Sequence, residues 1–351
     1  MSFPKMRAVV IDPFVESYGD IRVSHVPRPR PKRDEILVRV IAAGVNFVDT
    51  LYARGKHQNN RRHVKPPFTL GLEFAGIIVS SGESSGFKPG DRVFGDYGGS
   101  YAEYISIPSS LWSTLQRIPP GWSFGDAAGL AATLPVSYGA LLLCGNLKEG
   151  ETVLVHAAAG GLGLAAVQIA KAVGARVIGT AGSEGKCRVA EKYGADICIN
   201  YQENPEWWKQ VQTMTGDSGV DLAYDSVGMV NASMKCLAHR GRIMVVGFSG
   251  REGNMEDVKM NRILLKQAQV VGYRYGETSR RYPREREVIW HDLYKMIERG
   301  VIKPTRFEKE YRGLESVPEA LHDIACRKVW GKAVIEVIAS EGDQQKAQAN
   351  L

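Results

Sequence analysis

Three glycines, Gly160, Gly161 and Gly163, separate a short apolar β-branched run, residues 153–155, from apolar residues at helical spacing in residues 164–173. This order predicts a strand, a tight turn and a helix. Glycines let a diphosphate approach the backbone closely, and the amides at the helix start, with the positive end of its dipole, bind phosphate oxygens. We therefore expect this turn, Leu162 included, to bind a dinucleotide.

Residues 176–181 predict the second parallel strand of the same unit, which ends at Gly182 and Ser183. An acidic side chain at this point would bind the adenosine ribose of NAD and repel the additional phosphate of NADP. The loop instead offers a hydroxyl and two cations that can neutralise a phosphate, from Ser183, Lys186 and Arg188. Glu184 could still turn inward as a ribose ligand, but the loop as a whole favours NADP.

The chain of 351 residues is long enough for two domains, and its 44% apolar and 24% charged residues are typical of a globular protein. The nearly uncharged run 153–170 is interrupted by glycines, so we expect a buried strand and helix and no membrane span. Five scattered cysteines allow no disulfide framework or metal cluster. The formal net charge of +7 is dispersed, so nucleic-acid binding is possible, but a generally basic surface is favoured.

Residues 1–128 contain short strand candidates between glycines and prolines, without alternating helices, which predicts a barrel-like β domain. These candidates are 8–11, 36–41, 73–80, 91–94 and 101–107. Over residues 129–276, strand candidates alternate with helical segments, at 153–155, 176–181, 196–199, 220–224, 242–247 and 270–273. Six strands with crossovers predict a doubly wound parallel sheet, the Rossmann arrangement of an α/β fold.

Beyond residue 276 the sequence predicts helices over 288–299 and 318–324 and strands over 305–311 and 333–338. The final strand has no place in a completed six-stranded sheet. We therefore expect residues 277–342 to return to the first domain and make it discontinuous, with 343–351 as a flexible tail.

Several motifs in this order resemble the medium-chain dehydrogenase/reductase superfamily, and within it the zinc-independent NADPH:quinone oxidoreductases of the zeta-crystallin type. They include GLEFAGIIVSSG, FKPGDRVFG, GGSYAEY, VLVHAAAGGLGLAAVQIAKAVGARVIGTAGSEGK, GADICINY and GKAVIEV. The resemblance covers nearly the whole chain. It implies a GroES-like barrel domain, a Rossmann domain inserted in it, and an active cleft between the two.

Metal-dependent members of the superfamily have a cysteine where this chain has Gly44 to Asn46, and a histidine where it has Leu72. Catalytic zinc needs three nitrogen, sulfur or oxygen ligands from the protein. Because two of them are replaced, the resemblance implies a metal-independent enzyme.

The resemblance also implies the cofactor contacts. Gly182, Lys186, Tyr201 and Arg327 match the group that surrounds the 2′-phosphate of NADPH, and Ser183 lies in the same loop. Phe248, after the fifth strand of the sheet, is expected to line the nicotinamide side.

The implied catalytic residues are Asn46, Asp49 and Tyr52. Asn46 is expected to contact the nicotinamide ribose or the substrate oxygen, Asp49 to hold the loop, and Tyr52 to donate a hydrogen bond or to pack. Related proteins often have the tyrosine where this chain has Leu51. The basic segment GKHQNNRRHVK, which ends at Lys65, is expected to favour acidic or large aromatic acceptors.

These features together predict an NADPH-dependent quinone oxidoreductase that transfers hydride directly to a quinone in the interdomain cleft. Two alternatives stay open: reduction of the carbon–carbon double bond of a 2-alkenal, enone or enoyl thioester, and an NADPH-regulated RNA-binding protein. The family suggests a homodimer. The expected location is the cytoplasm, or the peroxisome if Ala349–Leu351 is read as a targeting signal.

Overall fold

The computed structural model describes residues 4–61, 63–251 and 255–337, and the chain divides into two compact units. Residues 1–132 with 304–351 form the barrel unit, and residues 133–303 form the Rossmann unit. The C-terminal segment 343–351, with its expected flexible tail and targeting tripeptide, lies outside the described residues.

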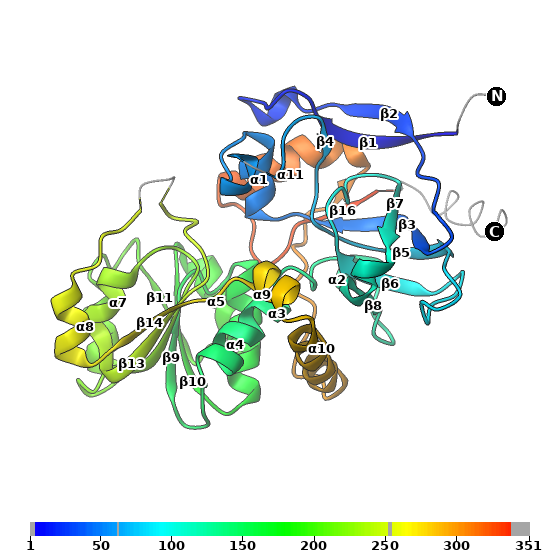
Figure 1. Cartoon of the computed structure of the whole chain (residues 1–351). Helices are drawn as coiled ribbons and strands as arrows, with labels where there is room; N and C mark the ends of the chain where they lie inside the picture. Colours follow the sequence, from blue (N-terminus) through cyan, green and yellow to red (C-terminus); the bar gives the residue numbers. More distant parts are fainter. Residues whose placement is uncertain (1–3, 62, 252–254, 338–351) are drawn as a thin grey trace. The chain divides into compact units, whose positions relative to one another are not determined.

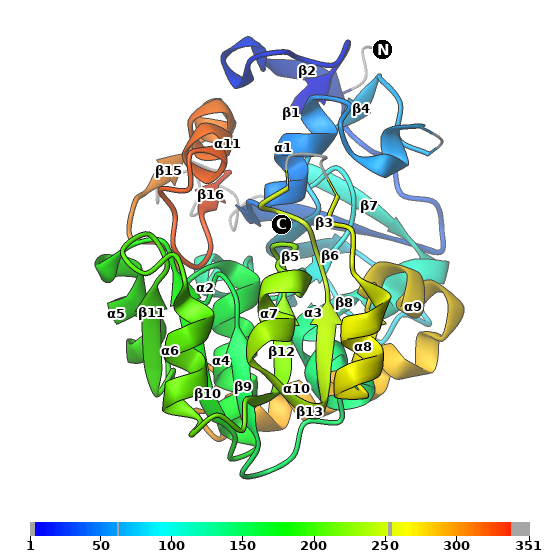
Figure 2. The same ribbon diagram turned by 90° about the vertical axis from the view of Figure 1, so that its left-hand side faces the viewer.

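The Rossmann unit contains six parallel strands in the order β11-β10-β9-β12-β13-β14, of which Figure 2 labels β9 to β13. The order of a doubly wound dinucleotide fold, with its reversal between β9 and β12, is thereby confirmed. The strands are β9 (Thr152–Val155), β10 (Arg176–Ala181), β11 (Ile197–Asn200), β12 (Val220–Asp225), β13 (Leu237–Val245) and β14 (Gln269–Gly272).

Helices cover both faces of this sheet (Figure 1). One face carries α4 (Gly161–Ala172) and α5 (Glu184–Lys192); the other carries α6 (Trp207–Met214), α7 (Val230–Cys236) and α8 (Met260–Lys266), which face the viewer in Figure 2. Buried apolar side chains fill the space between strands and helices, among them Leu154, Ile178, Trp207, Met234 and Ile243.

The unit continues through α3 (Leu134–Tyr138), a π-helical turn (Gly139–Cys144), α9 (Tyr275–Arg281) and α10 (Pro283–Glu298). The boundary with the barrel unit therefore differs from the predicted 276/277. Residues 277–303 belong to the Rossmann unit because α10 buries Trp290 and Leu293 and packs on α3, where Tyr138 donates a hydrogen bond of 2.7 Å to Asp292.

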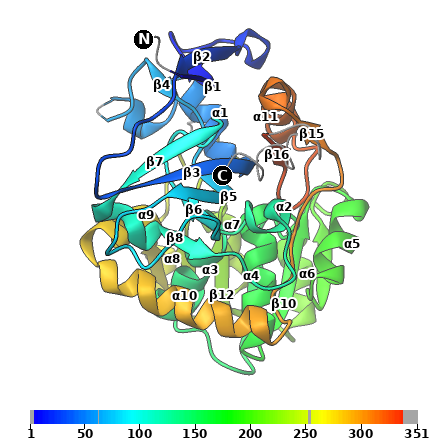
Figure 3. The ribbon, with the colours of Figure 1, turned by 90° about the vertical axis from the view of Figure 1, so that its right-hand side faces the viewer.

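The barrel unit is built on the long strand β3 (Glu35–Gly44), which pairs with β5 (Glu73–Ser80), β7 (Tyr104–Pro108) and β16 (Val334–Glu336). The last segment of the chain thus returns to the first strands, where α11 (Val317–Ala325) lies near α1 (Phe47–Ala53) (Figure 3). The remaining strands are β1 (Lys5–Ile11), β2 (Val23–Pro27), β4 (Phe68–Thr69), β6 (Arg92–Asp96), β8 (Leu115–Arg117) and β15 (Tyr311–Arg312), and a short helix α2 spans Phe124–Ala127.

Some strand limits in this unit differ from the sequence-based prediction. The strands β2, β4 and β8 were not predicted, because short, half-exposed strands lack a clear alternating pattern. The strand expected at 101–107 begins only at Tyr104, and the one expected at 305–311 is reduced to β15 and an isolated bridge at Arg306. No helix in the described ranges is both long enough and apolar enough to span a membrane.

Candidate active site

The glycine turn after β9 leads directly into the first turn of α4. Gly160 caps the helix without a side chain, so the amides of Gly161, Leu162 and Gly163 point out of its first turn without intrahelical acceptors. A Cβ on Gly163 would collide with the carbonyl oxygen of Ala157. Glycine is thus required for packing there, and the turn fits a diphosphate group.

The loop after β10 brings together four of the predicted cofactor residues. A Cβ on Gly182 would lie 2.7 Å from the hydroxyl of Tyr201, so only glycine allows this contact. Ser183 caps α5, and its Oγ accepts a hydrogen bond of 3.3 Å from the amide of Lys186. Glu184, the possible ribose ligand, is exposed. Gly182, Ser183, Lys186 and Tyr201 therefore lie along one edge of the sheet. Arg327 belongs to the barrel unit, just after α11.

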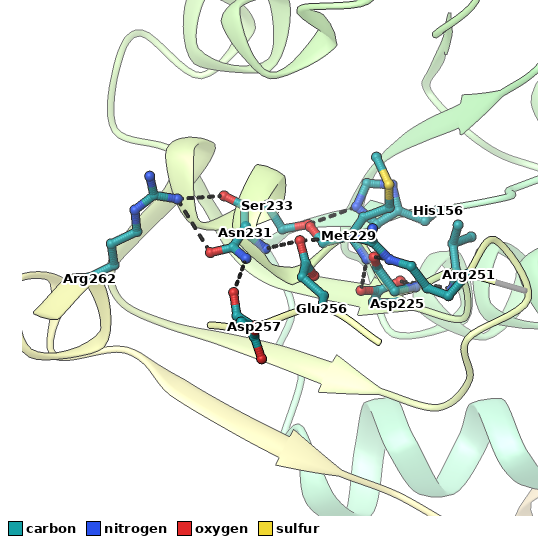
Figure 4. Close-up of polar contacts among 11 residues, drawn as sticks. His156, Asp225, Met229, Asn231, Ser233, Arg251, Glu256, Asp257 and Arg262 are labelled. Atoms are coloured by element: carbon teal, nitrogen blue, oxygen red, sulfur yellow. Dashed lines mark hydrogen bonds and ion pairs between the residues drawn. The ribbon is translucent and has the colours of Figure 1, made fainter. Parts of the chain in front are cut away.

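A buried polar network that the sequence analysis missed lies at the carboxyl ends of β9, β10 and β12 (Figure 4). His156 contacts Thr180 Oγ1 through Nδ1 at 3.0 Å and Ser233 Oγ through Nε2 at 2.8 Å. Because the Ser233 hydroxyl already donates to the Met229 carbonyl, Nε2 of His156 carries the proton and Nδ1 accepts from Thr180. Burial lowers the pKa of His156, which agrees with this neutral tautomer. The imidazole therefore links three elements at the point where strand order reverses.

Asp225, the last residue of β12, fixes the adjoining loop. Its carboxylate accepts hydrogen bonds of 2.8, 2.8 and 2.6 Å from the amides of Val227, Gly228 and Met229. Asp225 is fully buried. The signal that could have revealed it is its position, an acidic residue at the end of a buried strand and before a glycine.

The segment after β13 is tied to the same region. Arg251 donates from Nε to the Gly228 carbonyl at 2.5 Å and pairs with Glu256 at 3.0 Å, and Glu256 accepts from the amide of Asn231 in α7 at 3.1 Å (Figure 4). Phe248, three residues beyond β13, is held in this segment with 49% of its surface exposed. An exposed aromatic on an anchored loop suits contact with a planar ligand.

In the barrel unit, Asn46 is held by a buried ion pair. Lys332 donates to the Val45 carbonyl at 3.1 Å and to Asn46 Oδ1 at 2.8 Å, and it forms a salt bridge with Glu73, whose side chain is fully buried. Asn46 Nδ2 donates to Glu73 Oε1 at 2.9 Å, and Glu73 Oε2 accepts from the Ala132 amide at 2.9 Å. The ammonium and the carboxylate thus fix the orientation of the side-chain amide of Asn46. Glu73 accepts from one of the two Nδ2–H groups, and the second takes no part in these contacts.

Asp49, in the first turn of α1, completes this arrangement. Its Oδ2 accepts from the backbone amide of Asn46 at 2.8 Å and from the Tyr101 hydroxyl at 2.7 Å, contacts that fit the expected role of Asp49 in holding the loop. Burial raises the pKa of Asp49 to about 7. Its Oδ1 has no hydrogen-bond partner among the residues that the structure describes.

Tyr52 borders a cavity of about 560 Å³ in the barrel unit, together with Asp49 and Leu72. Its hydroxyl accepts a hydrogen bond of 2.8 Å from Asn59 Nδ2, and its ring lies 4.4 Å from that of His57. This volume is in the range of small-molecule sites. Tyr52 therefore both packs and faces a space in which a ligand could lie.

The positions at which zinc ligands would be expected do not fit zinc. Asn46 and Leu72 offer an amide and an alkyl group, and the Lys332 ammonium lies against Glu73, where a divalent cation would be repelled. Within residues 4–61, 63–251 and 255–337 no group of three or more His, Cys, Asp or Glu side chains could hold a metal ion.

Comparison with known proteins agrees with this geometry. Residues 32–118 match the family model of the alcohol dehydrogenase GroES-like domain, and residues 161–290 match that of the zinc-binding dehydrogenases. Quinone oxidoreductase-like protein 2 of Rattus norvegicus is 36% identical over 326 residues, which cover 88% of this chain and 87% of that protein. The chain belongs to the quinone oxidoreductase family of the medium-chain dehydrogenase/reductase superfamily.

Other members of the quinone oxidoreductase family are similar along most of their length. Human quinone oxidoreductase is 35% identical over 257 residues, 71% of this chain and 74% of that protein. The crystal structure of Escherichia coli quinone oxidoreductase complexed with NADPH superposes with a TM-score of 0.82 at 28% identity, and covers 95% of this chain and 99% of that one. The GroES-like and Rossmann domains of this family are therefore both present in the chain.

Proposed function

We propose that this family member is an NADPH-dependent quinone oxidoreductase that works without a metal. The observation that carries the proposal is the locked amide of Asn46, a fixed hydrogen-bond donor at the position where metal-dependent members supply a zinc ligand. A quinone carbonyl needs such a donor as negative charge develops on its oxygen. The names of the relatives reported above and the NADPH complex of the bacterial enzyme support the same activity.

The Rossmann unit is proposed to hold NADPH. The amides of Gly161, Leu162 and Gly163, capped by Gly160, would bind the diphosphate. The 2′-phosphate would lie at the loop after β10, where a cation and two hydroxyl groups are available and no acidic residue ends the strand. The residues proposed for the 2′-phosphate are Gly182, Ser183, Lys186 and Tyr201, with Arg327 from the barrel unit.

When bound, NADPH supplies a hydride. The reaction adds this hydride and one proton to the quinone, which becomes the hydroquinone while NADPH becomes NADP⁺. Asn46 donates its remaining Nδ2–H to the acceptor oxygen or to the ribose, Phe248 covers the nicotinamide, and Tyr52 holds the acceptor ring. Asp49 positions Asn46 because its carboxylate accepts a hydrogen bond from the backbone amide of Asn46. The final proton can come from water, since the reduced quinone is protonated readily.

We also propose a homodimer. Strand β14 pairs only with β13 in the described sheet and so presents a free edge, and the neighbouring α8 exposes Leu264 and Leu265 to 76% and 74%. A second copy that pairs along β14 would cover both features. Leu264→Asp/Leu265→Asp should give monomers in light scattering, whereas an unchanged mass would contradict this interface.

We place the protein in the cytoplasm, which localisation with and without residues 349–351 would test.

The decisive experiment is oxidation of NADPH and of NADH with a panel of ortho- and para-quinones, a 2-alkenal and an enone. We expect turnover of quinones with NADPH preferred, and a loss of about 100-fold in kcat/KM for Asn46→Ala, because one oriented donor contributes 10²–10³ to such reactions. Lys88→Met, an exposed change in the same unit, is the control. Turnover of the alkenal or enone alone would assign double-bond reduction instead. If NADPH binds and no acceptor reacts, salt-sensitive RNA binding becomes the function to measure.

A further inference from the structure

The cavity of the barrel unit has an asymmetric distribution of charge. Asp49 is its one carboxyl group among the described lining residues, and that group is buried with a pKa of about 7. Lys65 is exposed, and its ammonium has no ion-pair partner within the described ranges. The exposed side of the cavity thus carries the ammonium of Lys65. The carboxylate of Glu35 also contacts the lining, where it accepts a hydrogen bond of 2.8 Å from Ser106.

A second cation lies close to the same lining. The guanidinium of Arg28 lies 3.8 Å from the centre of the Tyr104 ring, and Tyr104 and the neighbouring Pro29 both border the cavity. His63, exposed and two residues before Lys65, adds an imidazole to the rim. Of the basic segment predicted to matter, Arg61 lies outside the lining and Arg62 lies outside the described residues.

The interior of the cavity is apolar and aromatic. Its lining includes Met6, Phe68, Leu70, Leu72 and the ring of Tyr97. Burial raises the pKa of Tyr97, so its phenol stays neutral at physiological pH and can donate a hydrogen bond. Because Leu70 and Asp49 are buried whereas His63 and Lys65 are exposed, the apolar part forms the floor, and the Lys65 ammonium and the His63 imidazole form the rim.

We propose that this cavity selects ring acceptors that carry an acidic substituent, and that Lys65, supported by His63, is the specificity-determining residue. The aromatic ring lies on the apolar floor, and the carboxylate or sulfonate faces the rim. This inference rests on the proposed quinone reductase activity and names the substrate class of that site. An ammonium about 6 Å from an anion in water-like surroundings favours it by about threefold in affinity.

The test compares 1,4-naphthoquinone with 1,4-naphthoquinone-2-sulfonate in wild type, Lys65→Met and Lys65→Arg. For Lys65→Met we expect KM for the sulfonate to rise about threefold, with kcat and the KM for the neutral quinone unchanged; Lys65→Arg should behave as wild type. The difference should vanish at high ionic strength, because salt screens exposed charges. Lys88→Met serves as the matched control, since Lys88 is an exposed lysine of the same unit outside the lining.

A binding measurement separates this inference from the proposed function. Naphthalene-2-sulfonate cannot accept hydride, and calorimetric titration should show weaker binding to Lys65→Met than to wild type, even if neither quinone is reduced. Absence of turnover with both quinones would overturn the quinone reductase. Equal sulfonate affinities of wild type and Lys65→Met, or equal KM ratios, would overturn the anionic subsite. If Lys65→Met raises KM only for crotonyl coenzyme A, the anion is a nucleotide phosphate, and the ring-acceptor proposal fails.

Discussion

The buried pair of Lys332 and Glu73 offers the sharpest test of how the barrel unit positions Asn46. Lys332→Met removes the ammonium but keeps most of the volume of the side chain. Glu73 would then retain two neutral donors, the Asn46 side chain and the Ala132 amide, around a fully buried negative charge. Breaking a buried ion pair from one side costs about 3–5 kcal/mol, whereas replacing both partners by groups of similar volume is often neutral.

We therefore expect Lys332→Met to lower the free energy of unfolding of the barrel unit by about 3–5 kcal/mol, and the double change with Glu73→Gln to recover most of this loss. Because the two units need not unfold together, hydrogen exchange of peptides from β3 and β5 is the appropriate measurement. Lys88→Met should leave exchange unchanged. A loss below about 1 kcal/mol, or a double variant as unstable as the single one, would refute the reasoning, since the carboxylate would then not depend on the ammonium.

Three further predictions concern the other site residues. Because the pKa of Asp49 is raised to about 7 in the folded chain, the wild type should lose stability as pH rises from about 4, the pKa in the unfolded chain, to about 7, whereas Asp49→Asn should not. In urea denaturation the free energy of unfolding of the wild type should therefore fall by roughly 3–4 kcal/mol relative to that of Asp49→Asn between about pH 4 and 8, and an unchanged difference would contradict this. Lys186→Ala should raise KM for NADPH by roughly tenfold and leave that for NADH unchanged, because a charge-assisted hydrogen bond to phosphate is lost, whereas Lys192→Ala at the far end of α5 should change neither. Gly163→Ala should cost about 1–3 kcal/mol in thermal stability and weaken NADPH binding because of the clash at Ala157, unlike Gly185→Ala, whose Cβ would meet only the Arg188 guanidinium at an ordinary contact distance of 3.9 Å; equal effects of the two would argue against the tight glycine turn.

Local patterns were sufficient for the elements of the Rossmann unit. Strand β10 coincides with the predicted range 176–181, since a continuous buried apolar run is visible without knowledge of neighbours. The limits of the barrel strands were less predictable, because β2 and β4 are short and half-exposed, and their hydrogen bonds come from distant partners on β1. The place of α10 depended on its packing on α3, which the helix sequence does not specify.

In the candidate site, too, some features follow from the local sequence and others depend on contacts between distant elements. The loop of Gly182, Ser183 and Lys186 follows from residue types at a fixed distance from the glycine turn, because the backbone geometry of a strand–turn–helix unit is local. The tautomer of His156 could not be predicted, since it depends on Thr180 and Ser233 from other elements.

The sequence by itself determined the family, the alternation of strands and helices, the glycine turn and the absence of the expected zinc-ligand types at positions 44–46 and 72. Only the tertiary structure decided that Lys332 reaches Asn46 and Glu73, and that Lys65 borders the cavity with Asp49. The physical reason is sequence separation. Contacts within one turn or strand follow from local backbone preferences, whereas an ion pair that joins residues from opposite ends of the chain exists only after β16 has paired with β3.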